Sequence, residues 1–171
     1  SLQRGRASSP EPAPSPGTPP PLGREVFLAL TGLGTRPGLP PADLLLGPAA
    51  LPLVVGRRHQ QDFIRRAISP QYVNYLSREH FRIEEGAAGR LLLVALTDNP
   101  MWRVRNGSEH AELARGESIA LADGDRIALG TSSGDAGYAT PEEAVRTLCW
   151  RLQEAPAPSS RGASPGACAG F

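Results

Sequence analysis

Several residue types are absent or scarce in this chain of 171 residues, and each absence excludes a class of protein. All 18 basic residues are arginine, so no lysine is present to serve a phosphate-binding Walker loop. Two cysteines are too few for the disulfide framework of a small secreted domain, which favours an intracellular location, nuclear or cytoplasmic. No apolar run approaches the roughly 20 residues that cross a bilayer. The net charge of +1 gives no field toward nucleic acid or a membrane.

Proline and glycine are abundant, and their distribution indicates where the chain folds. Residues 1–23 and 153–171 are rich in Pro, Ser, Gly and Ala, and such segments bury too little apolar surface to order, so both are expected to be disordered tails. One folded domain is expected over residues 24–152. Since the chain begins at Ser1 rather than at methionine, it can be a piece of a longer protein, and the lack of a targeting signal has no weight.

The pattern inside the folded window is that of β-strands. Short apolar or alternating runs cover residues 25–30, 51–55, 80–84, 91–96, 102–105, 118–121, 126–129 and 148–152. Asp123-Gly124 separates two of them, which is a strong hairpin signal. Short helices are expected at residues 61–67 and 141–146, the second with Thr140 as its N-cap. About eight short strands at close spacing predict an all-β sandwich of two antiparallel sheets.

Four polar signatures follow or precede these strands. They are Gly56-Arg57, Ser77-Arg78-Glu79-His80, Asn99 and Asn106-Gly107. In order and spacing, over residues 51–129, this set resembles the forkhead-associated (FHA) domain, a β-sandwich of the SMAD/FHA type that binds phosphothreonine in partner proteins. The resemblance implies a phosphopeptide-binding module, with a phosphothreonine-containing protein or peptide as its partner.

The resemblance also implies which residues contact the phosphate. A phosphate dianion needs a fixed guanidinium and neutral donors, because charge-assisted hydrogen bonds are the strong ones. Arg57 is expected to supply the guanidinium, with its neighbour Arg58 as a competitor for that role. Ser77 is expected to donate its hydroxyl to the phosphate, and Arg78 to add a second, more exposed cationic contact.

Other residues are expected to position the peptide and the loops. The resemblance assigns the contact with the peptide backbone to Asn99, with Asn106 as the alternative. His80 is expected to be buried and to hold the binding loops by hydrogen bonds. Gly56 and Gly107 are expected to support the site structurally.

Two departures from the family pattern support an alternative function. Asp98 stands where many FHA domains have a small hydroxylic residue, and Pro100 replaces the glycine that commonly follows the asparagine. A carboxylate near a phosphate is repulsive unless an arginine neutralises it. The alternative is therefore a degenerate FHA-type domain that reads no phosphate and acts as a structural or dimerisation scaffold.

The long segment over residues 57–77 and the N-terminal tail raise two further hypotheses. The segment either selects peptide residues beyond the phosphothreonine or is a floppy insertion. The tail carries Thr18 before a proline, so phosphorylated Thr18 could occupy the domain's own site and cause self-association.

Catalysis and metal binding are not expected. Ser77, His80 and Asp98 do not make a hydrolase triad, because residues three apart at a strand start point to opposite faces. His59, His80 and His110 lack the spacing of metal ligands. We therefore expect no catalytic residue, no metal and no cofactor.

Overall fold

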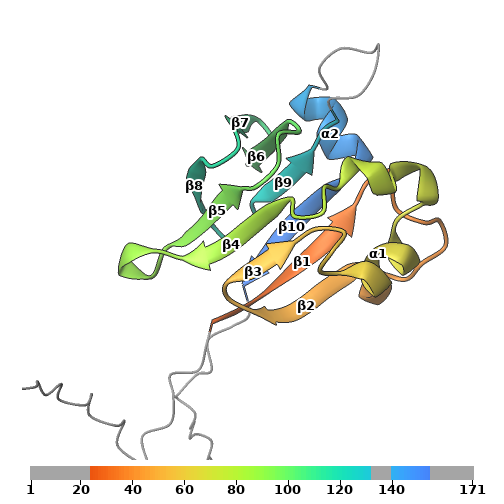
Figure 1. Cartoon of the computed structure of the whole chain (residues 1–171), viewed down its shortest axis with the longest axis horizontal. Coiled ribbons are helices and arrows are strands. Elements are labelled where there is room, and N and C mark those ends of the chain that lie inside the picture. Colours follow the sequence, from red (N-terminus) through yellow and green to blue (C-terminus); the bar gives the residue numbers. More distant parts are fainter. Residues whose placement is uncertain (1–23, 132–139, 155–171) are drawn as a thin grey trace, which may run out of the picture.

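The computed structural model describes residues 24–131 and 140–154, and the structural statements below concern these ranges (Figure 1). Thr18 and all but two residues of the expected tails lie outside them. The exceptions, Gln153 and Glu154, belong to a strand, so regular structure continues two residues past the expected end of the domain at residue 152.

The fold is a sandwich of two antiparallel sheets, as predicted. The larger sheet has six strands in the order β2 (Leu45–Ala50), β1 (Glu25–Thr31), β10 (Cys149–Glu154), β9 (Arg126–Leu129), β6 (Met101–Arg105) and β7 (Glu109–Leu113). The smaller sheet has four strands in the order β3 (Leu53–Val55), β4 (Phe81–Glu85), β5 (Leu91–Ala95) and β8 (Ser118–Leu121). Figure 1 shows β1 and β10 side by side, which brings the first and last described residues together.

The core lies between the two sheets and follows the alternation of the strands. β1 buries every second side chain, and β4 buries Phe81 and Ile83 in the same way. Trp150 of β10 is the largest fully buried side chain. Because each fully buried aliphatic or aromatic side chain contributes about 1.5–3 kcal/mol, this alternation determines which face of each strand points inward.

The eight predicted strand segments all contain a strand, and two further strands were not predicted. β2 is an exposed edge strand whose sequence includes Gly47 and Pro48, residues that normally indicate a loop. β7 is the other edge of the larger sheet, and its sequence Glu-His-Ala-Glu-Leu buries only Leu113. β7 has no apolar face, and Gly47 and Pro48 interrupt the apolar residues of β2, so the alternation that identified the other strands is missing. The run predicted at residues 51–55 is a strand only from Leu53 to Val55.

Two short α-helices lie where they were predicted. α1 (Gln61–Ala67) has the predicted bounds, and α2 (Pro141–Thr147) extends one residue further. The Glu143 N–H donates to Thr140 Oγ1 and the Thr140 N–H donates to Glu143 Oε2, which is a capping box at the start of α2. Short 3₁₀ helices complete the elements at η1 (Pro41–Leu44), η2 (Pro70–Tyr75) and η3 (Ala87–Gly89). No helix of the described ranges is long and apolar enough to span a membrane.

The two α-helices pack on different parts of the sandwich. α2 covers the outer face of the larger sheet, where Ala144 joins Trp102, Val104, Ala128 and Cys149 in a small second cluster. α1 belongs to the β3–β4 connection and packs into the main core, where Phe63 stacks on Trp150 with the ring centroids 5.8 Å apart. The long connection is therefore folded, which removes the interpretation of it as a floppy insertion.

Candidate functional site

Three loops meet at one end of the strands of the smaller sheet, which we call the loop edge of this sheet. Val55 lies opposite Phe81 and Phe81 opposite Ala95, so β3 and β5 end, and β4 begins, at the same edge. Val94 lies opposite Ser118, which brings the β7–β8 turn to this edge as well. A shallow hollow of about 410 Å³ lies between the loops, and we call it the Ser77 hollow. Its lining includes three arginines, two carboxylates and three neutral polar residues: Arg58, Arg78, Arg115, Glu79, Asp98, Ser77, Thr97 and Asn99.

Two hydroxyl groups lie together in the Ser77 hollow. Ser77 Oγ is 2.6 Å from Thr97 Oγ1, and the Asn99 N–H donates to the same Thr97 oxygen at 3.1 Å. Thr97 is buried whereas Ser77 is half-buried. The two hydroxyls carry two hydrogens and only one lies between them, so the other is left to donate. Either hydroxyl can be the donor of the pair, and when Thr97 donates, the Ser77 hydroxyl hydrogen is left to donate into the hollow.

His80 holds the backbone that leads to Ser77. The imidazole is completely buried, and its Nδ1 accepts a hydrogen bond from the Ser77 N–H at 3.0 Å. Burial lowers the pKa of His80 to about 3, so the ring is neutral at physiological pH. An accepting Nδ1 places the ring hydrogen on Nε2, which is buried and has no partner among the described residues. His80 therefore acts on the loop geometry and carries no charge toward a ligand.

Gly56 allows the end of β3 to approach the Ser77-Arg78 backbone. The Arg57 N–H donates to the Ser77 carbonyl at 3.0 Å, and the Arg58 N–H donates to the Arg78 carbonyl at 3.1 Å. A Cβ at position 56 would lie 2.2 Å from the Arg78 carbonyl oxygen, a distance that real Cβ atoms do not show. Only glycine permits this approach.

Gln60 fastens the start of the same loop. Its Oε1 accepts a hydrogen bond from the Gly56 N–H, and its Nε2 donates to the Val54 carbonyl, both at 2.8 Å. The side-chain amide thus bridges two backbone groups at the end of β3. A loop fixed in this way loses little conformational entropy when a ligand binds.

Among the described residues, both carboxylates at the Ser77 hollow are in ion pairs, whereas two of its arginines are not. Asp98 forms an exposed ion pair with Arg115 at 3.2 Å, and Glu79 accepts from His59 Nε2 at 3.0 Å. The hydrogen bond from His59 and the nearby charges of His59 and Arg58 lower the pKa of Glu79, so this carboxylate stays ionised. Arg58 and Arg78 are exposed and form no ion pair within the described part of the chain.

The Arg57 side chain is not among the residues that line the Ser77 hollow. It lines a separate hollow of about 340 Å³ beside α1, which we call the Arg57 hollow. Its lining includes Arg36, Arg57, Ile64, Arg65, Ile68 and Val73. The neighbouring residues Arg57 and Arg58 thus line different hollows. Arg58, the alternative candidate for the phosphate contact, lines the hollow that contains Ser77 and Arg78.

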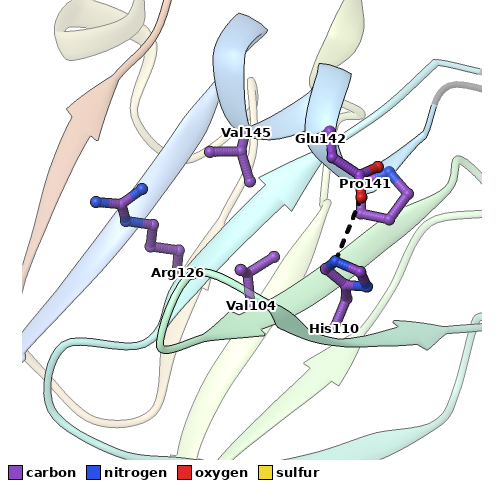
Figure 2. A pocket seen from close by; sticks show the side chains of 7 residues that line it. Val104, His110, Arg126, Pro141, Glu142 and Val145 are labelled. Atoms are coloured by element: carbon purple, nitrogen blue, oxygen red, sulfur yellow. Dashed lines mark ion pairs between the residues drawn. The ribbon is translucent and has the colours of Figure 1, made fainter.

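Asn106 and Gly107 also lie away from the Ser77 hollow. They form the β6–β7 turn, where their φ angles are 55° and 76°, whereas Asn99 precedes the start of β6. The five residues of β6 span roughly 16 Å at 3.3 Å per residue, so the two asparagines lie beyond opposite ends of this strand. Gly107 lines a small hollow between the hairpin and α2, in which His110 and Glu142 face each other at 3.5 Å (Figure 2).

Four residues of the site could not be assigned from the sequence with the roles they have here. Thr97 ends an apolar run and gives no signal of its own. Gln60 lies in a polar stretch with no motif. Arg115 lies in the β7–β8 turn, which was hidden because β7 was not predicted. The sequence does not show which of Arg57 and Arg58 lines the Ser77 hollow, because this depends on the directions of their side chains.

Comparison with known proteins gives a likeness of fold. No family model matches the chain, and no curated protein matches it. Among solved structures, an engineered FHA domain with a Myc-pTBD peptide matches 79% of this chain and 94% of its own, at 16% identity and a TM-score of 0.46. The FHA domain of human APLF, solved with an XRCC1 bisphospho peptide, matches 75% of this chain and 97% of its own, at 19% identity and a TM-score of 0.43.

A third solved structure is Rad53 1-466 in complex with AMP-PNP. It matches 77% of this chain and 30% of its own length, at 18% identity and a TM-score of 0.45. These similarities concern the course of the chain, and no residue role follows from them.

Proposed function

We propose that this protein is a non-catalytic module that binds phosphothreonine-containing peptides in the Ser77 hollow. The observation that carries the proposal is the Ser77–Thr97 hydroxyl pair beside Arg58 and Arg78, two guanidiniums without an ion pair in the described ranges. Such a set matches a phosphate dianion, which needs cationic and neutral donors together.

Each group has a chemical role in the proposed complex. Ser77 donates its hydroxyl to a phosphate oxygen. Arg58 and Arg78 supply the positive charge from two adjacent backbone segments, which are joined by the hydrogen bond from Arg58 N–H to the Arg78 carbonyl. Asn99, whose backbone is held by Thr97, offers an amide to the peptide backbone. His80, Gly56 and Gln60 act only by holding the loops.

The number of contacts is sufficient for useful affinity. A hydrogen bond to a charged group contributes about 1.5–3 kcal/mol, and micromolar binding requires about 8 kcal/mol in total. Two or three good phosphate contacts, together with those to the peptide backbone, reach this value. The fixed loops keep the entropic cost low.

The Asp98–Arg115 ion pair bears on the alternative of a degenerate scaffold. An unpaired carboxylate at this position would repel phosphate, but Arg115 lies 3.2 Å from it and offsets its charge. Both side chains are largely exposed, so the pair is screened and weak. Asp98 therefore reduces phosphate affinity without abolishing it, and we favour the reader over the scaffold.

The test is a titration of labelled peptides that carry phosphothreonine, threonine or phosphoserine at one position, followed by fluorescence anisotropy. Selective binding of the phosphothreonine peptide, weakened about tenfold or more by Arg78→Gln and by Arg58→Gln, supports the proposal. Arg90→Gln is the matched control, because Arg90 is an exposed arginine in the β4–β5 connection at the opposite edge of the sheet. Equal affinity for the phosphorylated and unphosphorylated peptides, with folded protein, would favour the scaffold.

The partner in this proposal is a phosphorylated protein, and an intracellular location fits it. The buried Cys149 is a free thiol whose pKa burial raises to about 11, so it stays protonated and unreactive in a reducing compartment. The partner's identity is to be sought with the peptide preferences that the titration defines.

A further inference from the structure

The Arg57 hollow carries an unbalanced positive charge. Three guanidiniums, those of Arg36, Arg57 and Arg65, line it, and no described aspartate or glutamate does. Asp62 lies 3.8 Å from Arg65, at the limit of an ion pair, and both side chains are highly exposed. Like charges that converge without a counter-ion destabilise the free protein, so this arrangement favours an anion.

One of these guanidiniums is incompletely satisfied. Arg57 Nε is buried and has no hydrogen-bond partner among the described residues. Arg36 is held from behind, since its Nε donates to the Arg65 carbonyl at 3.0 Å and its backbone N–H donates to the Ala67 carbonyl at 2.8 Å. Its two terminal nitrogens therefore remain available as donors at the hollow.

The other part of the lining is apolar. Ile64 and Ile68 are buried residues of α1 and its C-cap, and Val73 of η2 lies beside them. Because Phe63 of the same helix is stacked on Trp150 in the core, this wall is rigid. A ligand of the hollow thus needs negative charge and an adjoining aliphatic group, which is the chemistry of an acidic peptide segment.

The two hollows adjoin through the peptide bond between Arg57 and Arg58. Their backbone N–H groups donate to successive carbonyls, those of Ser77 and Arg78. Adjacent Cα atoms are about 3.8 Å apart, so the linings of the two hollows share a boundary at this peptide bond. A single peptide chain is therefore able to occupy both.

We propose that the Arg57 hollow is a second subsite that binds an acidic or phosphorylated residue, with an aliphatic neighbour, in the segment flanking the phosphothreonine of the same partner. This inference rests on the proposed function of the Ser77 hollow. It makes the β3–β4 connection the element that determines specificity and gives Arg57 a contact with the flank rather than with the phosphothreonine.

The test uses fluorescence anisotropy with short labelled peptides that carry phosphothreonine or threonine at the centre. On either side they carry a Glu-Leu-Glu flank or its neutral counterpart Gln-Leu-Gln. We expect the wild-type protein to bind the acidic phosphopeptide about tenfold more tightly than the neutral one. Arg57→Gln should remove this advantage and leave the affinity for the neutral phosphopeptide unchanged. Arg65→Gln, a change at an exposed side chain, should reduce the advantage without affecting the melting temperature.

The outcomes separate this subsite from the phosphothreonine site. Equal wild-type affinities for the two phosphopeptides would overturn the subsite alone. So would an Arg57→Gln variant that loses affinity for both equally, since Arg57 would then contact the phosphothreonine itself. Arg57-dependent binding of the acidic peptides regardless of phosphorylation would support the subsite and contradict the phosphothreonine site. Failure of every peptide to bind would overturn both, and Arg90→Gln again serves as the control variant.

Discussion

The hydroxyl oxygens of Ser77 and Thr97 lie 2.6 Å apart, although the two residues are separated by 20 positions in the sequence and belong to different loops. This hydrogen bond joins the β3–β4 loop to the β5–β6 loop. It connects the neutral donor of the proposed phosphate site to a buried residue.

Ser77→Ala should weaken binding of the phosphothreonine peptide with little effect on folding. A hydrogen bond to a charged group contributes about 1.5–3 kcal/mol, which corresponds to a rise in Kd of roughly tenfold or more. The loss in unfolding free energy should be about 1 kcal/mol, for one neutral hydrogen bond. Anisotropy and urea denaturation measure the two quantities. Thr97→Ser, which keeps the hydroxyl, is the control, and an unchanged Kd in Ser77→Ala would contradict the role of Ser77.

Asp98→Asn should raise the affinity for the phosphopeptide, because it removes a negative charge from the edge of the hollow. Arg115→Gln should lower it, because Asp98 is then no longer neutralised. Both effects should be about two- to fivefold, as the pair is exposed and contributes less than about 1 kcal/mol. Measured at low and high salt, the effects should shrink as screening increases. A loss of affinity in Asp98→Asn and a gain in Arg115→Gln would show that Asp98 itself contacts the peptide.

Gly56→Ala should destabilise the domain and abolish binding together. The added Cβ meets the Arg78 carbonyl at 2.2 Å, so β3 must separate from the loop at a cost of about 1–3 kcal/mol or more. Gly107→Ala is the comparison, because a Cβ there meets nothing within 4 Å and only its φ of 76° is unfavourable, costing about 1–2 kcal/mol. Urea denaturation should rank the two variants, and Gly107→Ala should still bind. Normal peptide binding by Gly56→Ala would show that the loop does not need this approach.

The buried His80 should make the domain less stable in mild acid. Its pKa is about 3 in the folded state, whereas a histidine in the unfolded chain titrates near 6.5. Between these values the unfolded state binds more protons, so the stability present above pH 6.5 falls by about 1.4 kcal/mol per unit as the pH decreases toward 3. Denaturation of wild-type protein and His80→Asn from pH 7 to 5 should show a flatter slope in the variant. Arg90→Gln should keep the wild-type slope, and an unchanged slope in His80→Asn would assign the acid sensitivity elsewhere.

The sequence predicted those parts of the fold that depend on local pattern. The α1 helix has the predicted bounds because its apolar side chains recur at helical spacing and are the ones that the fold buries. β4 follows the predicted alternation of Phe81 and Ile83. The edge strands β2 and β7 were not predicted because an edge strand is paired on one side only and is largely exposed, so its sequence need not alternate between apolar and polar residues.

The site was predictable in position and less so in detail. The loops that carry Ser77, Arg78 and Asn99 converge, since strand order alone brings them to one edge. The directions of Arg57 and Arg58 depend on Gln60, α1 and the Ser77-Arg78 backbone, contacts that no local pattern encodes. The dipeptide Asn106-Gly107 is compatible both with a binding loop and with a hairpin turn. Because β6 separates it from the Ser77 hollow, it is a hairpin turn in this fold.

The stacking of Phe63 on Trp150 joins the loop that lines both hollows to the central strand β10. Opening of α1 therefore disturbs the core, and the hydrogen-bonded amide hydrogens of Ile64 and Ile68 should exchange with solvent more slowly than those of the exposed loops. Under the proposed function, a partner peptide therefore meets a surface that is already ordered before it binds.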